Sequence, residues 1–444
     1  MESQFPEGIR FYGTLNSSVA VEDIRVTYEV GDRNTTQYNY LKLDRTGDDP
    51  SIIGGELFVN TNAPERYIPP GSVIKYQLEV LAADGESYVS ERRETLLLDA
   101  RFEWETVTSG PVTVYYHGPV QSRAETLAEK TSEGLELMAP VTGSEIETPI
   151  AIMLYNNNAE MIKAVVPRST TISRELITEG QAFGEENTVL VLAGRSDIGT
   201  ATHEITHVLV GRASNGATLV PFWLNEGLAE YGNLDKTISY TRYLEWAVGT
   251  GRLPTLKSLN RAPGDPNLTL VGYGSGRSAV AFMVEEFGAQ KMAKLLATLG
   301  AGIPIQDAIP VAYGMSFDDL ENRWRISIGA DLYVAPTVTP TSSVPTPTAT
   351  PGALLPFTLD DIAAAGQATA TPEATDVTGE QTPIADATET PEAVGSEGGG
   401  GSCNAAGNNG PAQAAPLLGI SALLFTGVWR TVRRRGRRMS SLGA

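Results

Sequence analysis

The chain has 444 residues, of which 41% are apolar, so it is long enough to bury a sizeable core and to form two or three domains. Its formal net charge is −20 at pH 7 and no basic nucleic-acid surface is visible, which argues against nucleic acid as a partner; no glycine-rich phosphate loop is visible either. A single cysteine excludes an intramolecular disulfide.

Residues 1–100 predict an antiparallel β-sandwich of immunoglobulin or fibronectin type. Short runs rich in Val, Ile and Tyr alternate with turn signals such as Gly31-Asp32 and Pro69-Pro70-Gly71. Six or seven strands at this spacing are typical of such a sandwich, but no chemistry is visible in it. The predicted strands cover residues 9–15, 21–30, 38–43, 52–59, 73–82 and 88–98.

Residues 101–333 predict a second domain, in which a small sheet precedes a mainly helical lobe, so the fold class is α+β. We expect a cleft between the strand-rich part and the helical part, because pockets commonly form between such layers. The predicted strands are residues 102–107, 112–117, 149–155 and 187–193, and the predicted helices are residues 121–138, 198–210, 222–231, 239–248, 278–288, 290–299 and 317–328.

The sequence His203-Glu204-Ile205-Thr206-His207 predicts a metal site on the helix at residues 198–210. Four residues bring the two imidazoles back to one face of the helix, so both can reach one ion, while Glu204 lies beside the metal rather than on it. The chain contains three histidines in all, so this pattern has little chance of arising by accident. The expected helix boundaries are Ser196 or Asp197 as the N-cap and Gly211 as the stop.

A second helix, at residues 222–231, supplies a candidate third ligand in Glu226, which follows His207 after eighteen intervening residues. Two histidines and one glutamate leave a coordination position open for water, and zinc in hydrolytic sites lowers the pKa of that water to about 7. Glu204 can then take the proton as general base and pass it to the leaving amine.

The two motifs resemble those of the gluzincin zinc metallopeptidases, especially the M1-type aminopeptidases and the bacterial peptidase-MA-like proteins. The resemblance implies that His203, His207 and Glu226 hold zinc and that Glu204 is the catalytic base. It also implies that Glu230, one turn after Glu226, fixes a ligand histidine through its second ring nitrogen. The alternative for Glu230 is an exposed acid on an amphipathic helix.

The stretch Gly272-Tyr273-Gly274-Ser275-Gly276, which we expect to open a helix, resembles the tyrosine-x-x-glycine element of these enzymes. Tyr273 is therefore the candidate catalytic residue that stabilises the oxyanion, and an ordinary core tyrosine is the alternative.

By the same resemblance, the strand before the metal-binding helix is a sheet edge that binds an extended peptide by strand addition. The expected substrate-binding residues are Thr188, Val189, Leu190, Val191 and Leu192. Residues 184–187 (Gly-Glu-Glu-Asn) resemble in part the element with which M1 aminopeptidases hold the free amino terminus of a substrate. An M1-like aminopeptidase is thus an alternative enzyme class.

Residues 334–413 are rich in Thr, Pro, Ala, Ser and Gly and predict a disordered stalk. Lys and Arg are absent between Arg325 and Arg430, so repulsion between its acidic residues should keep the stalk extended. Its repeated Thr-Pro pairs are typical of O-glycan carriers.

Residues 414–429 form an apolar run, and residues 430–444 form a basic tail with six arginines. The run is shorter than the roughly 20 residues that cross a bilayer, but the arginines predict a membrane or sorting segment with a cytoplasmic C-terminus. A soluble amphipathic helix is the alternative. The ending resembles bacterial C-terminal sorting signals, which implies a sorting protease as partner and Cys403 as a processing or attachment site; an idle thiol is the alternative.

We therefore expect a zinc metallopeptidase that acts on peptide or protein substrates at the extracellular face of the cell membrane. No signal peptide is visible in residues 1–10, so we expect that the start is misplaced or the chain truncated. The alternative function is a non-catalytic surface adhesion or scaffold protein, whose sandwich binds a ligand and whose peptidase domain is a relic. The intact set of ligands and base favours the enzyme.

Overall fold

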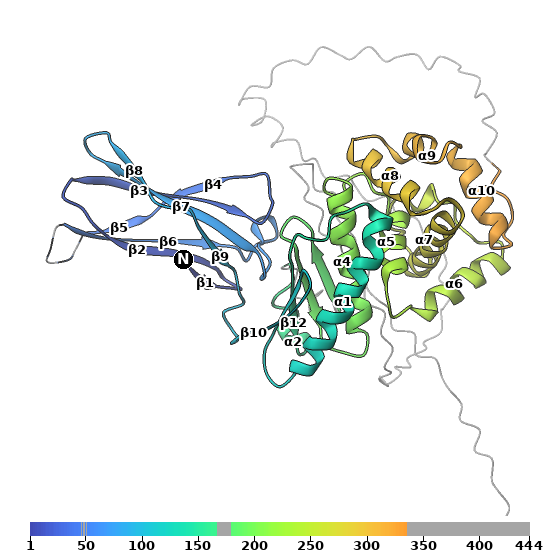
Figure 1. Cartoon of the computed structure of the whole chain (residues 1–444), viewed down its shortest axis with the longest axis horizontal. Coiled ribbons are helices and arrows are strands. Elements are labelled where there is room, and N and C mark those ends of the chain that lie inside the picture. Colours follow the sequence, from blue (N-terminus) through green and yellow to red (C-terminus); the bar gives the residue numbers. More distant parts are fainter. Residues whose placement is uncertain (46, 48, 50, 167–178, 335–444) are drawn as a thin grey trace, which may run out of the picture. The chain divides into compact units, whose positions relative to one another are not determined.

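The computed structural model describes residues 1–45, 47, 49, 51–166 and 179–334 (Figure 1). The predicted apolar segment at 414–429, the basic tail at 430–444, Cys403 and all of the predicted stalk except Val334 lie outside the described residues. Within the described ranges, no helix combines the length and the apolar character needed to cross a bilayer.

The N-terminal region contains two antiparallel sheets, as predicted, with the orders β1-β2-β6-β5 and β4-β3-β7-β8, and β9 also pairs with β7. Strand β3 alternates inward residues such as Val26 and Tyr28 with more exposed ones, which is the period of a strand buried on one face. The strands are β1 (Glu2–Gln4), β2 (Gly8–Asn16), β3 (Val21–Val30), β4 (Gln37–Tyr40), β5 (Lys42–Asp44), β6 (Ile52–Asn60), β7 (Val73–Ala82), β8 (Ser87–Val89) and β9 (Arg93–Leu96).

Two predicted strands of this region are each divided in two. The run at 38–43 breaks at Leu41, whose buried side chain marks the point where the chain passes from one sheet to the other. Strand β4 therefore pairs with β3, while β5 pairs with β6. The run at 88–98 likewise gives β8 and β9, which both pair with β7.

A third sheet follows, in the order β10-β11-β12-β14-β13. Strands β11, β12 and β14 are parallel, and the two outer strands are antiparallel to their neighbours. Val189 and Val191 of β14 pack with the helices, whereas Leu190 joins the core that contains the sandwich residues, so this sheet is buried on both faces. The strands are β10 (Glu105–Ser109), β11 (Val112–Tyr116), β12 (Ile150–Tyr155), β13 (Gly180–Phe183) and β14 (Thr188–Leu192).

The position of β14 corrects one expectation. Strand β14 pairs with β12 on one side and with β13 on the other, so the backbone groups of Thr188, Val189, Leu190, Val191 and Leu192 are already used within the sheet. The prediction that these residues form the substrate-binding edge is therefore wrong. Among the described residues, the edge on this side of the sheet is β13.

Helices α1 and α4 pack against the third sheet, and the remaining long helices form the predicted helical lobe (Figure 1). Helix α4 contacts β13 and β14, which places the HEITH sequence beside the sheet edge. The helices are α1 (Gln121–Thr142), α2 (Asn158–Met161), α4 (Asp197–Ala213), α5 (Phe222–Gly232), α6 (Ile238–Gly249), α7 (Pro266–Phe287), α8 (Ala289–Gly300), α9 (Ile305–Tyr313) and α10 (Phe317–Ser327).

Helix α7 begins twelve residues before its predicted start, so the stretch Gly272–Gly276 lies inside the helix and does not open it. Glycine disfavours a helix interior, but here close packing requires it. A Cβ on Gly272 would lie 2.9 Å from the Phe222 ring, and one on Gly274 would meet the Tyr240 carbonyl oxygen. Neighbouring helices thus occupy the space that side chains would need.

Another close approach joins α7 to the helix that carries Glu226. A Cβ on Gly227 would lie 2.5 Å from the backbone of Gly276, so the two helices touch through glycine backbones. We expect Gly227→Ala to lower the free energy of unfolding by about 1–3 kcal/mol, because neither backbone can give way without moving α5. Denaturant titration measures this change.

Gly211 provides the matched control. It was expected to end α4, but the helix continues to Ala213, and a Cβ on Gly211 would meet no atom within 4 Å. Gly211→Ala should therefore raise the free energy of unfolding by about 0.5–1 kcal/mol. Equal effects of the two substitutions would contradict the proposed contact between α5 and α7.

Candidate metal centre

Three buried side chains from α4 and α5 converge on one point. The Nε2 atoms of His203 and His207 lie 3.2 Å apart, and they lie 3.5 and 3.6 Å from Oε2 of Glu226. Two ligands of a tetrahedral zinc ion, each about 2.1 Å from the metal, are separated by about 3.4 Å. The predicted ligand set is thus assembled with the spacing of a zinc site.

The second nitrogen of each imidazole is held by an oxygen of α5. Nδ1 of His203 lies 2.9 Å from Oε1 of Glu230, and Nδ1 of His207 lies 3.1 Å from Oδ1 of Asn225. A carboxylate or amide oxygen accepts hydrogen bonds, so each ring donates from Nδ1 and directs the lone pair of Nε2 at the convergence point. Three electron-pair donors that face one another in a buried site are an arrangement that a bound metal ion would stabilise.

The carboxyl of Glu226 has a low pKa in this site. Burial opposes the charged form, but His207 and His203 outweigh that effect and lower the pKa of the Glu226 carboxyl to about 2. The carboxylate is therefore available as an anionic ligand throughout the neutral range.

Glu204 is fully buried, and neither of its carboxylate oxygens has a hydrogen-bond partner among the described residues. Burying a carboxylate without hydrogen bonds costs free energy unless a bound polar ligand supplies the missing partners. Strand β13 passes close by, since a Cβ on Gly180 would lie 2.9 Å from Oε1 of Glu204. Together with Oε2 of Glu226, which also lacks a hydrogen bond within the described ranges, Glu204 fits a site built for a metal ion and water.

Asn225 is the site residue that sequence reasoning missed. Its position directly before Glu226 was visible, but its contact depends on how α5 lies against α4. We expect Asn225→Ala to weaken zinc binding about 10- to 100-fold, because His207 loses the partner that fixes its orientation. Competition with a chromophoric chelator measures the affinity.

Asn225→Asp keeps the accepting oxygen and serves as the control for that substitution. Zinc affinity close to that of the wild type is expected for it. An equal loss in both variants would mean that Asn225 acts through packing and not through Oδ1.

Tyr273 lies on α7 against the start of α5. Its buried ring stacks on Tyr240, with the centroids 5.0 Å apart, and meets the edge of Phe222 at 5.5 Å. Phe222 is one helical turn before Glu226, so Tyr273 contacts the helix that carries the third ligand. Its role in stabilising an oxyanion stays a prediction.

Polar contacts fix the turn between β13 and β14, which resembles in part the amine-binding element of M1 aminopeptidases. Glu186 is buried in an ion pair with Arg33 of the sandwich, and Nδ2 of Asn187 donates to Asp32 at 2.6 Å. Arg212 donates to Oδ1 of Asn187 at 2.8 Å. These contacts hold the turn against the sandwich and α4, and binding of a substrate's amino terminus by this turn stays a prediction.

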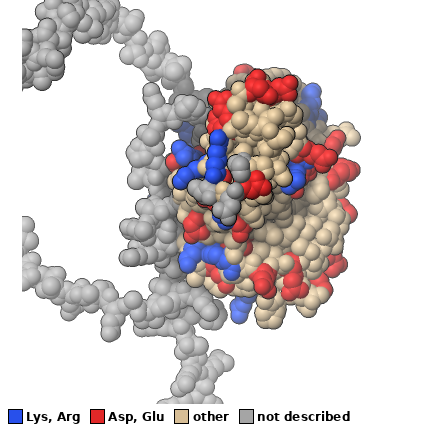
Figure 2. Space-filling view, turned by 90° about the vertical axis from the view of Figure 1, so that its left-hand side faces the viewer, with Lys and Arg blue, Asp and Glu red and all other residues tan. Residues whose placement is uncertain are grey.

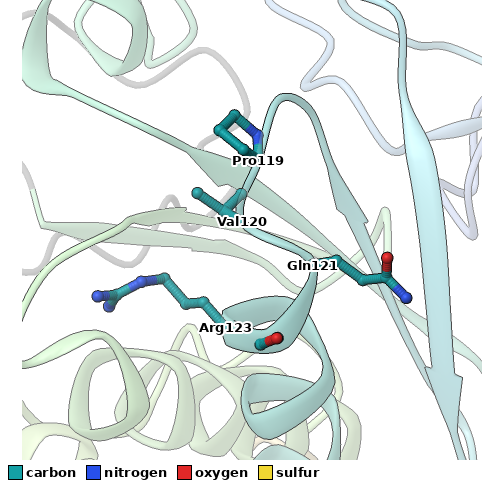
Figure 3. Close-up of a pocket in the computed structure, with 5 residues that line it drawn as sticks. Pro119, Val120, Gln121 and Arg123 are labelled. Carbon is teal, nitrogen blue, oxygen red and sulfur yellow. The ribbon is translucent and has the colours of Figure 1, made fainter.

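A pocket of about 480 Å³ lies at the start of α1 and contains none of the metal-site residues (Figure 3). Arg123 on its rim forms an ion pair with the buried Asp197, the first residue of α4, and donates to the carbonyl of Gly194 at 2.6 Å. It thus fixes the start of the metal-binding helix. The lining residues are Pro119, Val120, Gln121, Ser122 and Arg123.

Comparisons with known proteins give a family match over part of the chain. Residues 130–330 match the model of the Peptidase MA superfamily, and no curated protein matches the chain. An M1 zinc metallopeptidase from Deinococcus radiodurans aligns with a TM-score of 0.35 at 12% identity, over 74% of this chain and 88% of that chain. A mutant of that metallopeptidase aligns with a TM-score of 0.35 at 11% identity, and the aligned part covers 74% of this chain but only 65% of the mutant structure.

A cycloalternan-degrading enzyme from Trueperella pyogenes aligns with a TM-score of 0.16 at 13% identity, over 24% of this chain and 16% of that chain. Structural likenesses at this level carry no argument about function. Residues 130–330, which contain the whole metal motif, match the Peptidase MA superfamily, and the three converging side chains form a gluzincin-type ligand set.

Proposed function

We propose that this protein is a zinc-dependent peptidase that hydrolyses peptide bonds, with His203, His207 and Glu226 as the metal ligands and Glu204 as the general base. The observation that supports this proposal most strongly is the convergence of two Nε2 atoms and one carboxylate oxygen at 3.2–3.6 Å beside a buried Glu204 that has no hydrogen-bond partner among the described residues. When bound, zinc supplies Lewis acidity, which polarises a peptide carbonyl and lowers the pKa of water.

The side chains divide the remaining work. Glu204 takes a proton from the attacking water on one carboxylate oxygen and delivers it to the nitrogen of the leaving amine. Because Glu204 is fully buried, the proton cannot escape readily to bulk solvent. Glu230 and Asn225 hold the two imidazoles in one orientation throughout the reaction.

We propose that the substrate lies along β13. This strand is the sheet edge nearest to the catalytic base, because Gly180 at its start approaches Glu204 closely. A sheet edge offers backbone donors and acceptors to an extended peptide, and such pairing is independent of sequence. Because Glu186 and Asn187 already contact Arg33, Asp32 and Arg212, we propose internal cleavage of peptides rather than removal of amino-terminal residues.

We also propose, from the apolar run at 414–429 and the arginines that follow it, that the protein acts at the outer face of a membrane. Its acidic surface would suit that location; Figure 2 shows acidic side chains spread over one face with basic ones between them.

Metal removal and a peptide library test the proposed activity. Protein treated with a chelator should lose cleavage of library peptides, and one equivalent of zinc per chain should restore it. If zinc binds stoichiometrically and no peptide in a broad library is cleaved, the proposed activity is wrong.

A further inference from the structure

A second pocket, of about 580 Å³, lies on the helical lobe between α6, the turn that follows it and the first turn of α7. It contains no metal-site residue, and its lining combines cationic, aromatic and apolar side chains. The lining residues are Arg242, Tyr243, Trp246, Arg252, Asp265, Asn267 and Leu268.

The lining of this pocket carries more basic than acidic side chains, although the chain as a whole is acidic. Arg242 and Arg252 form no ion pair with any carboxylate of the described residues, although acidic residues outnumber basic ones by 53 to 33 in the full sequence. The one acid in the lining, Asp265, accepts a hydrogen bond from the backbone nitrogen of Asn267 at 2.8 Å and caps α7. The first turn of this 22-residue helix adds partial positive charge.

The apolar part of the pocket is exposed. Trp246 is 43% accessible, and the guanidinium of Arg252 lies over its ring at 5.7 Å from the centroid. Leu268 on the facing helix is 38% accessible. A ligand that carries a carboxylate beside an apolar group would pair with the arginines and cover the indole at the same time.

The pocket lies on α6 and α7, and α7 packs against α5, the helix that carries Glu226. Tyr240 of α6 stacks on Tyr273, and Tyr243 and Trp246 follow it at helical spacing toward Leu268. From the helix rise and the contact between Tyr273 and Phe222, we place the pocket within about 20 Å of Glu226. An extended peptide covers that distance with about six residues.

We propose that this pocket binds an acidic residue with an apolar neighbour in the polypeptide substrate, several residues away from the bond that is cut. That the ligand is a polypeptide substrate rests on the proposed peptidase function. That it is acidic and apolar follows from the side chains that line the pocket. Pairing outside the catalytic centre would give the enzyme a preference for acidic segments without any change in the metal site.

The direct test measures binding of a fluorescent peptide that carries two glutamates beside a phenylalanine, and of its counterpart with two glutamines. Full-length Glu204→Gln protein is used so that the peptide is not cut. The acidic peptide should bind about tenfold more tightly than the neutral one, and R242A/R252A should remove the difference. The preference should also fall as sodium chloride is raised.

The matched control is R66A/R323A. It removes two exposed arginines that lie outside the pocket and form no ion pair with any described residue. It changes the net charge equally, so it should leave the preference in place. Equal binding of the two peptides, or the same loss in both double variants, would overturn the proposal.

The two proposals fail separately. Wild-type protein that binds the acidic peptide through Arg242 and Arg252 but cleaves no peptide supports the pocket and rejects the peptidase function. Wild-type protein that cleaves acidic and neutral peptides with equal kcat/KM, and binds both equally, supports the peptidase function and overturns the pocket.

Discussion

Replacing Glu204 by glutamine is expected to lower kcat/KM for peptide cleavage by about 10²–10⁴-fold while zinc stays bound. The amide keeps the size of the side chain but cannot accept the proton of water or return it to the leaving amine. Because Glu204 forms no hydrogen bond with the described residues, the substitution breaks no protein contact of that kind. Steady-state kinetics and metal analysis of the same preparation check both parts.

Glu136→Gln on the exposed face of α1 is the control for the change from acid to amide. It should leave kcat/KM unchanged. If Glu204→Gln retained wild-type activity, Glu204 would not be the base. If it lost zinc as well as activity, Glu204 would contribute to holding the metal.

Glu226→Gln is expected to weaken zinc binding by more than about 100-fold, because it removes the anionic member of the ligand set. Loss of a residue that only hydrogen-bonds a metal ligand already weakens metal binding by about 10- to 100-fold. Zinc stabilises the folded chain only through its binding, by about 4 kcal/mol when its concentration is a thousand times Kd. The thermal midpoint of the wild type should therefore fall when a chelator is added, and that of Glu226→Gln should not.

The comparison with Glu204→Gln makes this second test specific. Both variants exchange one buried carboxylate for an amide within the same site, but only Glu226 lies within 3.6 Å of both Nε2 atoms. Glu204→Gln should retain the response to the chelator. A chelator response in Glu226→Gln equal to that of the wild type would remove Glu226 from the ligand set.

The pairing of His203 with His207 could be predicted because a helix brings residues four apart to one face. The roles of Glu226 and Glu230 depend on the crossing of α4 and α5, and they were implied by the resemblance to the gluzincin motifs. The contact of Asn225 could not be predicted in this way, because it depends on the crossing of α4 and α5.

The order of strands in the third sheet also could not be predicted from the sequence, because it depends on tertiary contacts. Strand β14 reads as a continuous apolar run, which indicates burial on both faces but not which strand lies next to it. The short strand β13 begins with Gly180 and has four residues, so it gave little signal, although it forms the edge beside Glu204.

Helix α7 was predicted too short because glycine propensity is a local quantity. Gly272, Gly274 and Gly276 argue for a loop when they are considered alone. In the fold they admit Phe222, Tyr240 and the backbone of α5, so tertiary packing overrides the local preference.

The most direct test of the zinc site is a crystal structure of the zinc-loaded protein with anomalous scattering data recorded on both sides of the zinc absorption edge. We expect one zinc peak about 2.0–2.2 Å from Nε2 of His203, Nε2 of His207 and Oε2 of Glu226. A zinc-loaded crystal with no anomalous peak at this point, or with its peak at another site, would contradict the proposed function.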